Sequence, residues 1–314
     1  MSFNMEDVHT IVNEPAIVHC SSIIETENKD LLCVWYQGSY ETSGDTKIMV
    51  KRKGIDNPTW ENAKVLFDFN GIPLGNPVLW KHEGILYITF SVLMSESWKS
   101  SLLFYACSHN NGITWSKPSL FTPTKGLMPK TQPLETSSGD ILFPLYHEAE
   151  YCPYVMIIQD LDKVIFSPLV AETMARNKAI QPALCSLSDG RILMYCRTNQ
   201  GTIWKSISYN NGYSWSICEP TNLLNPDSAV DLEVIDDTLF LVSNLSSKDR
   251  HALTLSISSD QGETWKLQSI IAEGSGEYSY PCMIKDSKKS IHITYTENRY
   301  SIKHVELTYD RLGL

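Results

Sequence analysis

The sequence lacks a run of apolar residues long enough to cross a membrane, and it lacks a sustained helical period outside residues 169–174. None of its eight cysteines stands in the C-x-x-C spacing of a zinc site, so we expect no metal and no other cofactor. Residues 1–7 have neither the charged nor the apolar part of a secretory leader. These absences predict a cytoplasmic protein without a membrane partner.

Positive charge is also scarce, with 26 Lys and Arg against 36 Asp and Glu and a net charge of −10. A nucleic-acid-binding surface is normally basic, so we expect no nucleic-acid partner. A local group of arginines can nevertheless bind an acidic ligand in an acidic protein. The hydrophobic content of 42% is sufficient for a globular core, whereas the oligomeric state is left open.

What the sequence does contain is a short phrase that recurs in register. Residues 108–115, 208–215 and 258–265 all read Ser-x-Asn/Asp-x-Gly-x-Thr/Ser-Trp, with first residues 100 and then 50 positions apart. Asn or Asp followed by Gly two residues later favours a turn, and the Trp can anchor the turn to apolar residues beneath it. A calcium site would need more carboxylates than one phrase supplies. We therefore interpret these three segments, the turn repeats, as structural turns between strands.

Weaker copies of the phrase at residues 53–60, 157–162 and 308–310 raise the number of registers to six. Each register follows two apolar stretches that are separated by a polar turn. A period near 50 residues with about four strands per unit is typical of a β-propeller. We predict an all-β fold in which residues 1–314 form a single six-bladed β-propeller domain. The sixth unit lacks its outer strand, and residues 8–12 are expected to supply it, which closes the ring by pairing the N- and C-terminal strands.

The turn repeats resemble the Asp-box, or BNR repeat, of the sialidase (neuraminidase) superfamily, whose members are six-bladed propellers. Nearly the whole chain is similar to the bacterial and plant sialidase-like proteins with BNR repeats. The similarity is carried by residues 35–38, 75–79, 145–148, 180–182, 197–204, 225–228, 278–281 and 295–297. It implies a carbohydrate or another acidic small molecule as the ligand, bound in the central funnel. It also implies a glycosidase that removes a terminal acidic sugar by exo-hydrolysis.

Sialidases bind the substrate carboxylate with three arginines, use an Asp as acid and base, and attack with a Tyr that a Glu assists. The resemblance assigns the second and third arginines to Arg197 and Arg250, since a guanidinium pairs with a carboxylate through two hydrogen bonds. It assigns the acid–base role to Asp45, which stands in a Ser-Gly-Asp phrase, with Glu41 as a nearby alternative.

The nucleophile of the resemblance is a Tyr in a Tyr-Ser phrase, which Tyr278 matches and for which Tyr280 is the alternative. The first arginine has no counterpart, because His19 stands nearest to its position. This departure leaves the identity of the acidic sugar open. His19 is itself a candidate for acid–base chemistry, since histidine titrates near neutral pH. The assisting Glu has no counterpart after the second arginine, and Glu148 or Asp231 could fill that role from another unit.

Further candidates stand at the ends of expected strands. His147 is expected to form a coupled acid–base pair with Glu148 and to contact the substrate. Trp98 and Trp204 are candidates for stacking against a sugar ring. Four polar residues stand just before the Pro of a first strand and are expected to contact the ligand, namely Asn76, Lys130, Gln132 and Gln181.

Two other functions fit the same residues. A polysaccharide lyase or another glycosidase could act on a glycan that contains uronate, with His19 and a Tyr as the reacting groups. A noncatalytic propeller could instead bind a glycan or a protein, because one fold hosts many unrelated functions. Release of a free sugar, formation of an unsaturated uronate, and binding without turnover distinguish the three functions.

Overall fold

The computed structural model describes residues 8–57, 59–160, 163–166 and 177–308. Within these ranges the regular structure consists of β-strands and one short 3-10 helix, η2 (Trp98–Ser100). The weak helical pattern of residues 169–174 lies outside the described residues. The last residues of the phrase copies that end at positions 162 and 310 lie outside them as well.

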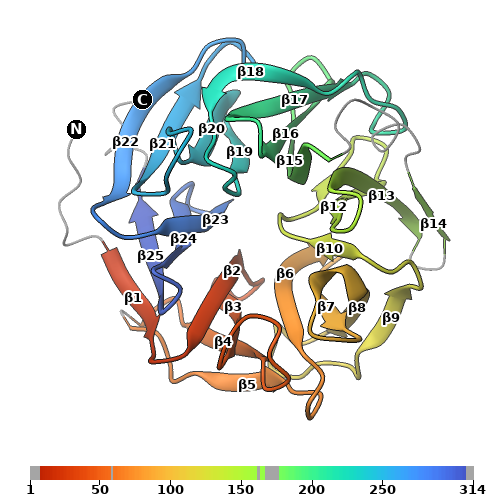
Figure 1. Ribbon diagram of the computed structural model, residues 1–314, viewed down its shortest axis with the longest axis vertical. Helices are drawn as coiled ribbons and strands as arrows, with labels where there is room; N and C mark the ends of the chain where they lie inside the picture. Colours follow the sequence, from red (N-terminus) through yellow and green to blue (C-terminus); the bar gives the residue numbers. More distant parts are fainter. Residues whose placement is uncertain (1–7, 58, 161–162, 167–176, 309–314) are drawn as a thin grey trace. The chain divides into compact units, whose positions relative to one another are not determined.

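The strands form six sheets, and Figure 1 labels most of the strands. Counted from β2, the first sheet contains β2 (Ile17–Glu25), β3 (Leu31–Gly38), β4 (Lys47–Lys53) and β5 (Lys64–Phe67), and the second contains β6 (Leu74–His82), β7 (Ile85–Leu93), β8 (Ser101–Ser108) and β9 (Ser119–Thr122). The third contains β10 (Leu127–Pro129), β11 (Leu134–Glu135), β12 (Ile141–His147), β13 (Cys152–Asp160) and β14 (Lys163–Phe166), and the fourth contains β15 (Ala179–Ser186), β16 (Ile192–Thr198), β17 (Thr202–Ser208) and β18 (Glu219–Leu224). The fifth contains β19 (Asp231–Ile235), β20 (Thr238–Ser243), β21 (Ala252–Ser258) and β22 (Lys266–Glu273), and the sixth contains β23 (Tyr278–Lys285), β24 (Ile291–Glu297), β25 (Ser301–Leu307) and β1 (Val8–Asn13).

These six sheets confirm the predicted all-β fold, a six-bladed β-propeller. The sixth sheet combines both ends of the described chain, because β1 pairs with β25 in antiparallel register (Figure 1). His9 lies opposite His304 in this pair, and Asn13 lies opposite Ser301. The N-terminal segment therefore supplies the strand that the sixth repeat lacks, as predicted.

The packing groups the chain into two compact units, and each is described by itself. One unit comprises residues 130–281, and the other comprises the described residues of 5–129 together with those of 282–314. The first unit contains β11 to β22 and the beginning of β23. That residues 1–314 form one domain stays a prediction.

The first two strands of most sheets are largely buried, whereas the fourth strands β1, β5, β9, β18 and β22 are mostly exposed or half-buried. In β3, seven of the eight residues are buried, which fits its apolar sequence LLCVWYQG. Strands that are covered on both faces have continuous apolar sequences of this kind. In β18 exposed and half-buried positions alternate instead, which fits a strand with one face in water.

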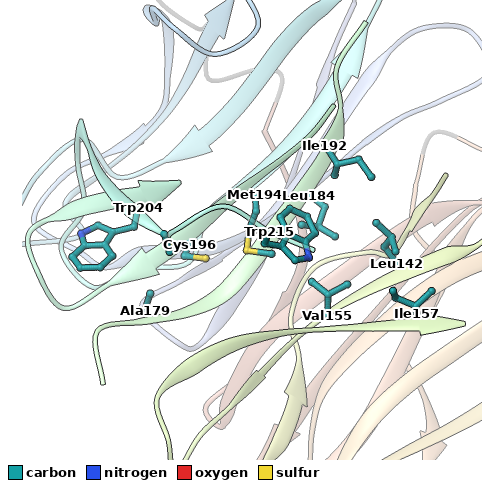
Figure 2. Packing of buried hydrophobic residues seen from close by; sticks show 11 residues of the cluster. Leu142, Val155, Ile157, Ala179, Leu184, Ile192, Met194, Cys196, Trp204 and Trp215 are labelled. Atoms are coloured by element: carbon teal, nitrogen blue, oxygen red, sulfur yellow. The ribbon is translucent and has the colours of Figure 1, made fainter. Parts of the chain in front are cut away.

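Sheets three and four share a core within the first unit (Figure 2). Trp215 of the second turn repeat is 7% exposed and packs in this core, as expected for a residue that anchors a turn. The other buried members are Leu142, Val155, Ile157, Ala179, Leu184, Ile192, Met194, Cys196, Trp204 and Cys218.

The three turn repeats connect the third and fourth strands of their sheets through the same hydrogen bonds. The hydroxyl oxygen of Ser108, Ser208 or Ser258 accepts from the N–H of the Gly four residues later, at 2.9, 2.8 and 2.9 Å. The side-chain oxygen of the Asn or Asp accepts from the N–H of the following Thr or Ser, at 2.9, 2.8 and 2.9 Å. These bonds satisfy backbone donors inside the turn, so the phrase is explained by local structure.

A β-bulge recurs in the first strand of several sheets. Cys20, Asn76 and Gln181 each have a positive φ, of 54°, 45° and 52°, at the point where the register to the second strand shifts. Tyr280, at the corresponding place in β23, has a φ of 54°. A bulge redirects a side chain and is common next to functional sites. Two of the four, Gln181 and Tyr280, belong to the site described below.

We predict that Gly212 of the second turn repeat is required for both its backbone conformation and its size. Gly212 and Gly190 both have a left-handed φ, of 82° and 87°. A Cβ on Gly212 would overlap the side chain of Leu142, whereas a Cβ on Gly190 would meet nothing within 4 Å. Gly190→Ala is expected to cost about 1–2 kcal/mol from backbone strain alone, and Gly212→Ala about 1–3 kcal/mol more from overpacking. Urea unfolding of both variants measures the difference, and equal losses would contradict this explanation.

Two buried histidines lie next to each other on β24 and β25 of the sixth sheet. His304 is fully buried, and its Nε2 lies 3.0 Å from Nδ1 of His292. Burial, followed by the charge of His292, holds the pKa of His304 below its usual value. The pKa of His292 is lowered as well, chiefly by burial, although the nearby Glu306 and Asp286 oppose this shift. The remaining charged or titratable neighbours are Lys53 and His9, which also lower the pKa of His304.

We predict that this histidine pair makes the protein less stable at mildly acidic pH. A lowered pKa means that the unfolded chain binds protons that the folded chain does not, so stability is fully present above about pH 6.5 and is lost as pH falls. Each such group contributes a slope of at most about 1.4 kcal/mol per pH unit. His304→Phe is expected to reduce the slope between pH 7 and 5 in thermal unfolding. The exposed His251→Gln serves as the control, and an unchanged slope in His304→Phe would refute the prediction.

Candidate functional site

The side chains of Arg197 and Tyr280 meet, although 83 positions separate them. Arg197, near the end of β16, donates from Nη1 to the Tyr280 hydroxyl oxygen at 3.1 Å and to Oε1 of Gln181 at 3.1 Å. Its Cζ lies 6.0 Å from the centroid of the Tyr280 ring. Gln181 donates from Nε2 to the same hydroxyl oxygen at 3.1 Å. Three of the predicted site residues therefore contact one another directly.

The orientation of the Gln181 amide follows from its partners. A guanidinium can only donate, so Oε1 must face Arg197, and Nε2 must face the hydroxyls of Tyr280 and Tyr146. The Tyr280 oxygen thus accepts one hydrogen bond from a cation and one from an amide. Two donors hold this oxygen in a defined position, which is a requirement for a group that takes part in a reaction.

Asp227, in the loop before β19, is the anionic partner of Arg197. Its Oδ1 accepts from Arg197 Nε at 2.7 Å and from the Tyr151 hydroxyl at 2.7 Å. Burial disfavours the charge of Asp227, but the hydrogen bond and the charge of Arg197 outweigh it and lower the pKa. Burial also opposes the charge of Arg197, whereas Tyr280 and Asp227 raise its pKa above the usual value. Both members of this pair are therefore charged at neutral pH.

Arg250 binds the loop that contains Asp227 through the backbone of that residue. Its Nη2 donates to the backbone carbonyl of Asp227 at 2.5 Å, and its Nη1 pairs with Glu277 at 2.8 Å. The buried Ser279 also donates to this Glu277 oxygen, at 2.9 Å. Protein acceptors thus bind both terminal nitrogens of Arg250. Its expected contact with a ligand carboxylate stays a prediction.

Lys130 approaches Tyr280 from the segment between β10 and β11. Its side chain is buried, and Nζ donates to the backbone carbonyl of Pro281 at 2.8 Å. The same Nζ lies 5.8 Å from the centroid of the Tyr280 ring, within the range of a cation–π contact. We call the group formed by Lys130, Gln181, Arg197, Asp227 and Tyr280 the Tyr280 cluster.

Of the two tyrosines that the sequence leaves open, only Tyr280 belongs to this cluster. The Tyr278 hydroxyl donates to the backbone carbonyl of Glu273 at 3.3 Å, and its side chain is almost completely buried. The positive φ of Tyr280, 54°, accounts for the difference, because it changes the direction of this side chain relative to that of Tyr278.

Three other candidates lie in the same unit without a direct contact to Arg197. His147 Nδ1 accepts from the backbone N–H of Glu150 at 3.1 Å, and Oδ1 of Asp231 accepts from that of Leu232 at 3.1 Å. The charge of Glu148 helps to raise the pKa of Tyr151, although burial is the larger cause. The proposed catalytic roles of these three residues stay predictions.

Asp45, in the other unit, is held in an exposed turn. The Ser39 hydroxyl donates to it at 2.5 Å and the Ser39 backbone N–H at 3.1 Å, and the Ser43 hydroxyl donates as well. These bonds, led by that of the Ser39 hydroxyl, lower the pKa of Asp45 to about 2. A general acid must carry a proton near neutral pH, so this environment differs from the one expected for the acid. The alternative, Glu41, forms an ion pair with Arg299.

His19 and Asn76 also belong to this second unit and are buried. His19 Nδ1 lies 3.0 Å from the Thr296 hydroxyl, and its ring packs edge-on against Tyr36 with centroids 5.8 Å apart. Asn76 donates from Nδ2 to the backbone carbonyl of Pro129 at 3.1 Å. Both side chains thus form hydrogen bonds within the protein, and their roles in catalysis or binding stay predictions.

The two tryptophans proposed for sugar stacking differ in burial. Trp98 is half-buried and lies 5.9 Å from the Tyr36 ring, and a side chain on Gly75 would overlap it. Trp204 is 6% exposed and packs in the core of Figure 2, where the ammonium of Lys178 lies 5.4 Å from its ring. The expectation that Trp204 stacks against a sugar is therefore corrected, because its faces are used in packing.

Sequence reasoning missed Asp227 and Tyr151 as members of the site. Residues 225–228 carry part of the family resemblance, which was the available signal, but no role was assigned to them. Both Asp227 and Tyr151 have a positive φ, of 56° and 47°. Such conformations in non-glycine residues concentrate where the surrounding contacts impose them, as at binding sites.

Comparison with solved structures gives sialidases of the same fold. A Hadza microbial sialidase matches 94% of this chain with a TM-score of 0.78 and 16% identity. The NanB sialidase of Streptococcus pneumoniae matches 97% with a TM-score of 0.81 and 11% identity, and the intramolecular trans-sialidase of Ruminococcus gnavus matches 97% with a TM-score of 0.79 and 12% identity. The chain covers 66%, 71% and 97% of these three proteins, so it spans slightly less than two thirds of the first. The fold is thus a sialidase-like β-propeller.

The family of this chain follows from its sequence as well as from its fold. The profile of the BNR repeat-like domain matches residues 29–293, and the chain belongs to this family. The predicted membership in the group of BNR-repeat, sialidase-like proteins is confirmed. A search of curated proteins finds no significant match.

No helix in the described part of the chain is long and apolar enough to span a membrane. No group of three or more His, Cys, Asp or Glu side chains within it could hold a metal ion. The cytoplasmic location and the absence of a nucleic-acid partner stay predictions.

We predict that Asp227 stabilises the cluster through its charge. Asp227→Asn keeps the shape but leaves the guanidinium of Arg197, 12% exposed, without an anionic partner. Because the Asp227 side chain is 40% exposed, we expect a loss of about 1–2 kcal/mol, below the value for a fully buried pair. Asp189→Asn, which breaks the exposed Asp189–Arg191 pair, should cost clearly less than Asp227→Asn. Chemical unfolding of both variants provides the comparison, and a neutral Asp227→Asn would contradict the prediction.

Proposed function

We propose that this protein binds a terminal acidic sugar of a glycan at the Tyr280 cluster and hydrolyses its glycosidic bond as sialidases do. The observation that carries the proposal is the direct contact of a guanidinium, Arg197, with a tyrosine hydroxyl, Tyr280. A site for an acidic sugar needs a cation for the carboxylate and a nucleophile next to it. Membership in the BNR repeat-like family and the fold shared with sialidases support the same reading.

Arg197 is suited to bind the carboxylate of the sugar. Its Nε and Nη1 are used by Asp227, Gln181 and Tyr280, whereas Nη2 forms no hydrogen bond with any residue in the described ranges. The two N–H groups of Nη2 can therefore donate to a ligand. Asp227 keeps the guanidinium in one orientation while it does so.

Tyr280 is suited to attack the anomeric carbon. A neutral phenol can approach a sugar that carries a carboxylate, whereas a carboxylate nucleophile would be repelled. In this scheme the Tyr280 oxygen bonds to the anomeric carbon as the bond to the leaving oxygen breaks, and water then releases the sugar with retained configuration. Glu148 or Asp231 is the proposed acceptor of the tyrosine proton.

The family resemblance assigns proton donation to the leaving oxygen to Asp45, which belongs to the other unit, and this role stays a proposal. Its pKa of about 2 means that it is ionised without substrate. Loss of the hydrogen bonds from Ser39 and Ser43 would return this pKa only toward its ordinary value, so protonation near neutral pH would also require that the carboxyl be removed from water.

The expected result is that Tyr280→Phe loses at least about 100-fold in kcat, while Tyr278→Phe stays within a few fold of the parent protein. The measurement is release of the fluorophore from a fluorogenic sialoside, followed by a panel of other acidic glycosides. Tyr278→Phe is a matched control, since it removes a hydroxyl from the same strand outside the cluster.

Three results would contradict the proposal. Tyr280→Phe could retain full activity, no acidic glycoside could be turned over, or the product could be an unsaturated uronate. The last result, seen as new ultraviolet absorbance, would indicate a lyase instead. Saturable binding of a glycan without any product would indicate a binding propeller.

A further inference from the structure

Lys130 stands out among the cations of the described chain. It is the only lysine or arginine in those parts of the chain that is almost completely buried, with 3% of its surface exposed. Charged residues are rarely buried unless a partner of opposite charge accompanies them. Arg197 and Arg250 have such partners, in Asp227 and Glu277. Lys130 forms no ion pair with the residues that the structure describes.

The hydrogen bonds of Lys130 leave part of its charge unmatched. An ammonium has three N–H donors. One donates to the Pro281 carbonyl at 2.8 Å, and within the described residues the other two have no acceptor. The Tyr280 ring, 5.8 Å from Nζ to its centroid, supplies only a weak attraction.

The charges of the Tyr280 cluster therefore do not sum to zero. Lys130 and Arg197 are both positive, and Asp227 is the one carboxylate among the five members. Gln181 is neutral, and both of its amide atoms already bind cluster partners. The cluster has one excess positive charge, in a chain whose net charge is −10.

We propose that Lys130 is the second cation of the ligand site and that it selects a ligand with a single carboxylate, placed next to Tyr280 where both cations approach the ring. The inference rests on the proposed function, because it concerns the same site. Lys130 Nζ and Arg197 Cζ lie 5.8 and 6.0 Å from one ring centroid, so both cations attract a carboxylate that lies beside the ring. One negative charge balances the cluster, whereas a doubly charged phosphate or sulfated acid would leave an unmatched anion.

This assignment explains how the site can bind an acid with fewer arginines than the family pattern. Arg250 is committed to Glu277 and to the Asp227 loop. Arg197 offers Nη2, and Lys130 offers two N–H groups. A lysine binds a carboxylate as a point charge, so the ligand is held with less geometric constraint than by an arginine fork.

The test compares binding of N-acetylneuraminate and of its neutral methyl ester by calorimetry. Lys130→Met removes the charge and keeps an apolar chain of similar length, and it is expected to weaken acid binding about 10–100-fold without affecting the ester. Lys130→Arg should retain most of the acid affinity. Lys178→Met is the matched control, because Lys178 in the same unit also lies over an aromatic ring, that of Trp204, outside the cluster.

Equal acid affinity in Lys130→Met and Lys178→Met would overturn the inference, as would tighter binding of a doubly charged sugar phosphate than of the acid. Thermal unfolding of each variant, with and without N-acetylneuraminate, shows whether the protein is folded, and a bound ligand must raise the midpoint. If acid binding depends on Lys130 but no glycoside is cleaved, the inference stands and the hydrolytic function fails. If sialosides are cleaved with unchanged kcat/KM in Lys130→Met, the function stands and the inference fails.

Discussion

The hydrogen bond between Arg197 and Tyr280 is the contact on which the candidate site depends. A guanidinium that is mostly removed from water must have acceptors for its donors, and the chain supplies them from three separate segments. Asp227 neutralises the charge, Gln181 accepts at Nη1, and Tyr280 accepts beside it. Each of these groups is oriented by the arginine as much as it orients the arginine. The site is therefore a connected network in which one cation determines the position of the reacting hydroxyl.

The backbone prepares this network through β-bulges. In a regular strand, side chains point alternately to the two faces of the sheet. None of them points along the end of the sheet. The positive φ of Gln181 and of Tyr280 changes the direction of each side chain. It brings the Gln181 amide within hydrogen-bond distance of the Tyr280 hydroxyl. Cys20 and Asn76 have the same backbone conformation in the other unit. The same backbone conformation thus recurs in several sheets, whereas the residue that adopts it differs from sheet to sheet.

The architecture could be predicted from the sequence because its signals are local. Each turn repeat contains both partners of its own hydrogen bonds within eight residues. The spacing of the turn repeats therefore gives the spacing of the sheets along the sequence. The site was harder to predict. In a regular strand Tyr278 and Tyr280 would point to the same face, and the positive φ of Tyr280 separates a hydroxyl that contacts Arg197 from one that bonds to Glu273. Asp227 was overlooked because its partners are 30 and 76 residues away.

Pairing of β1 with β25 has a consequence for how the protein is made. Residues 8–13 leave the ribosome long before their partner strand, residues 301–307, is synthesised. At roughly 5–20 residues per second, the first strand waits for about 15–60 seconds with its hydrogen-bonding groups unpaired. During that interval it is an open edge that another nascent chain could capture, as in strand exchange between neighbouring polypeptides. Slower translation in crowded polysomes would lengthen this interval and so increase the chance of such strand exchange.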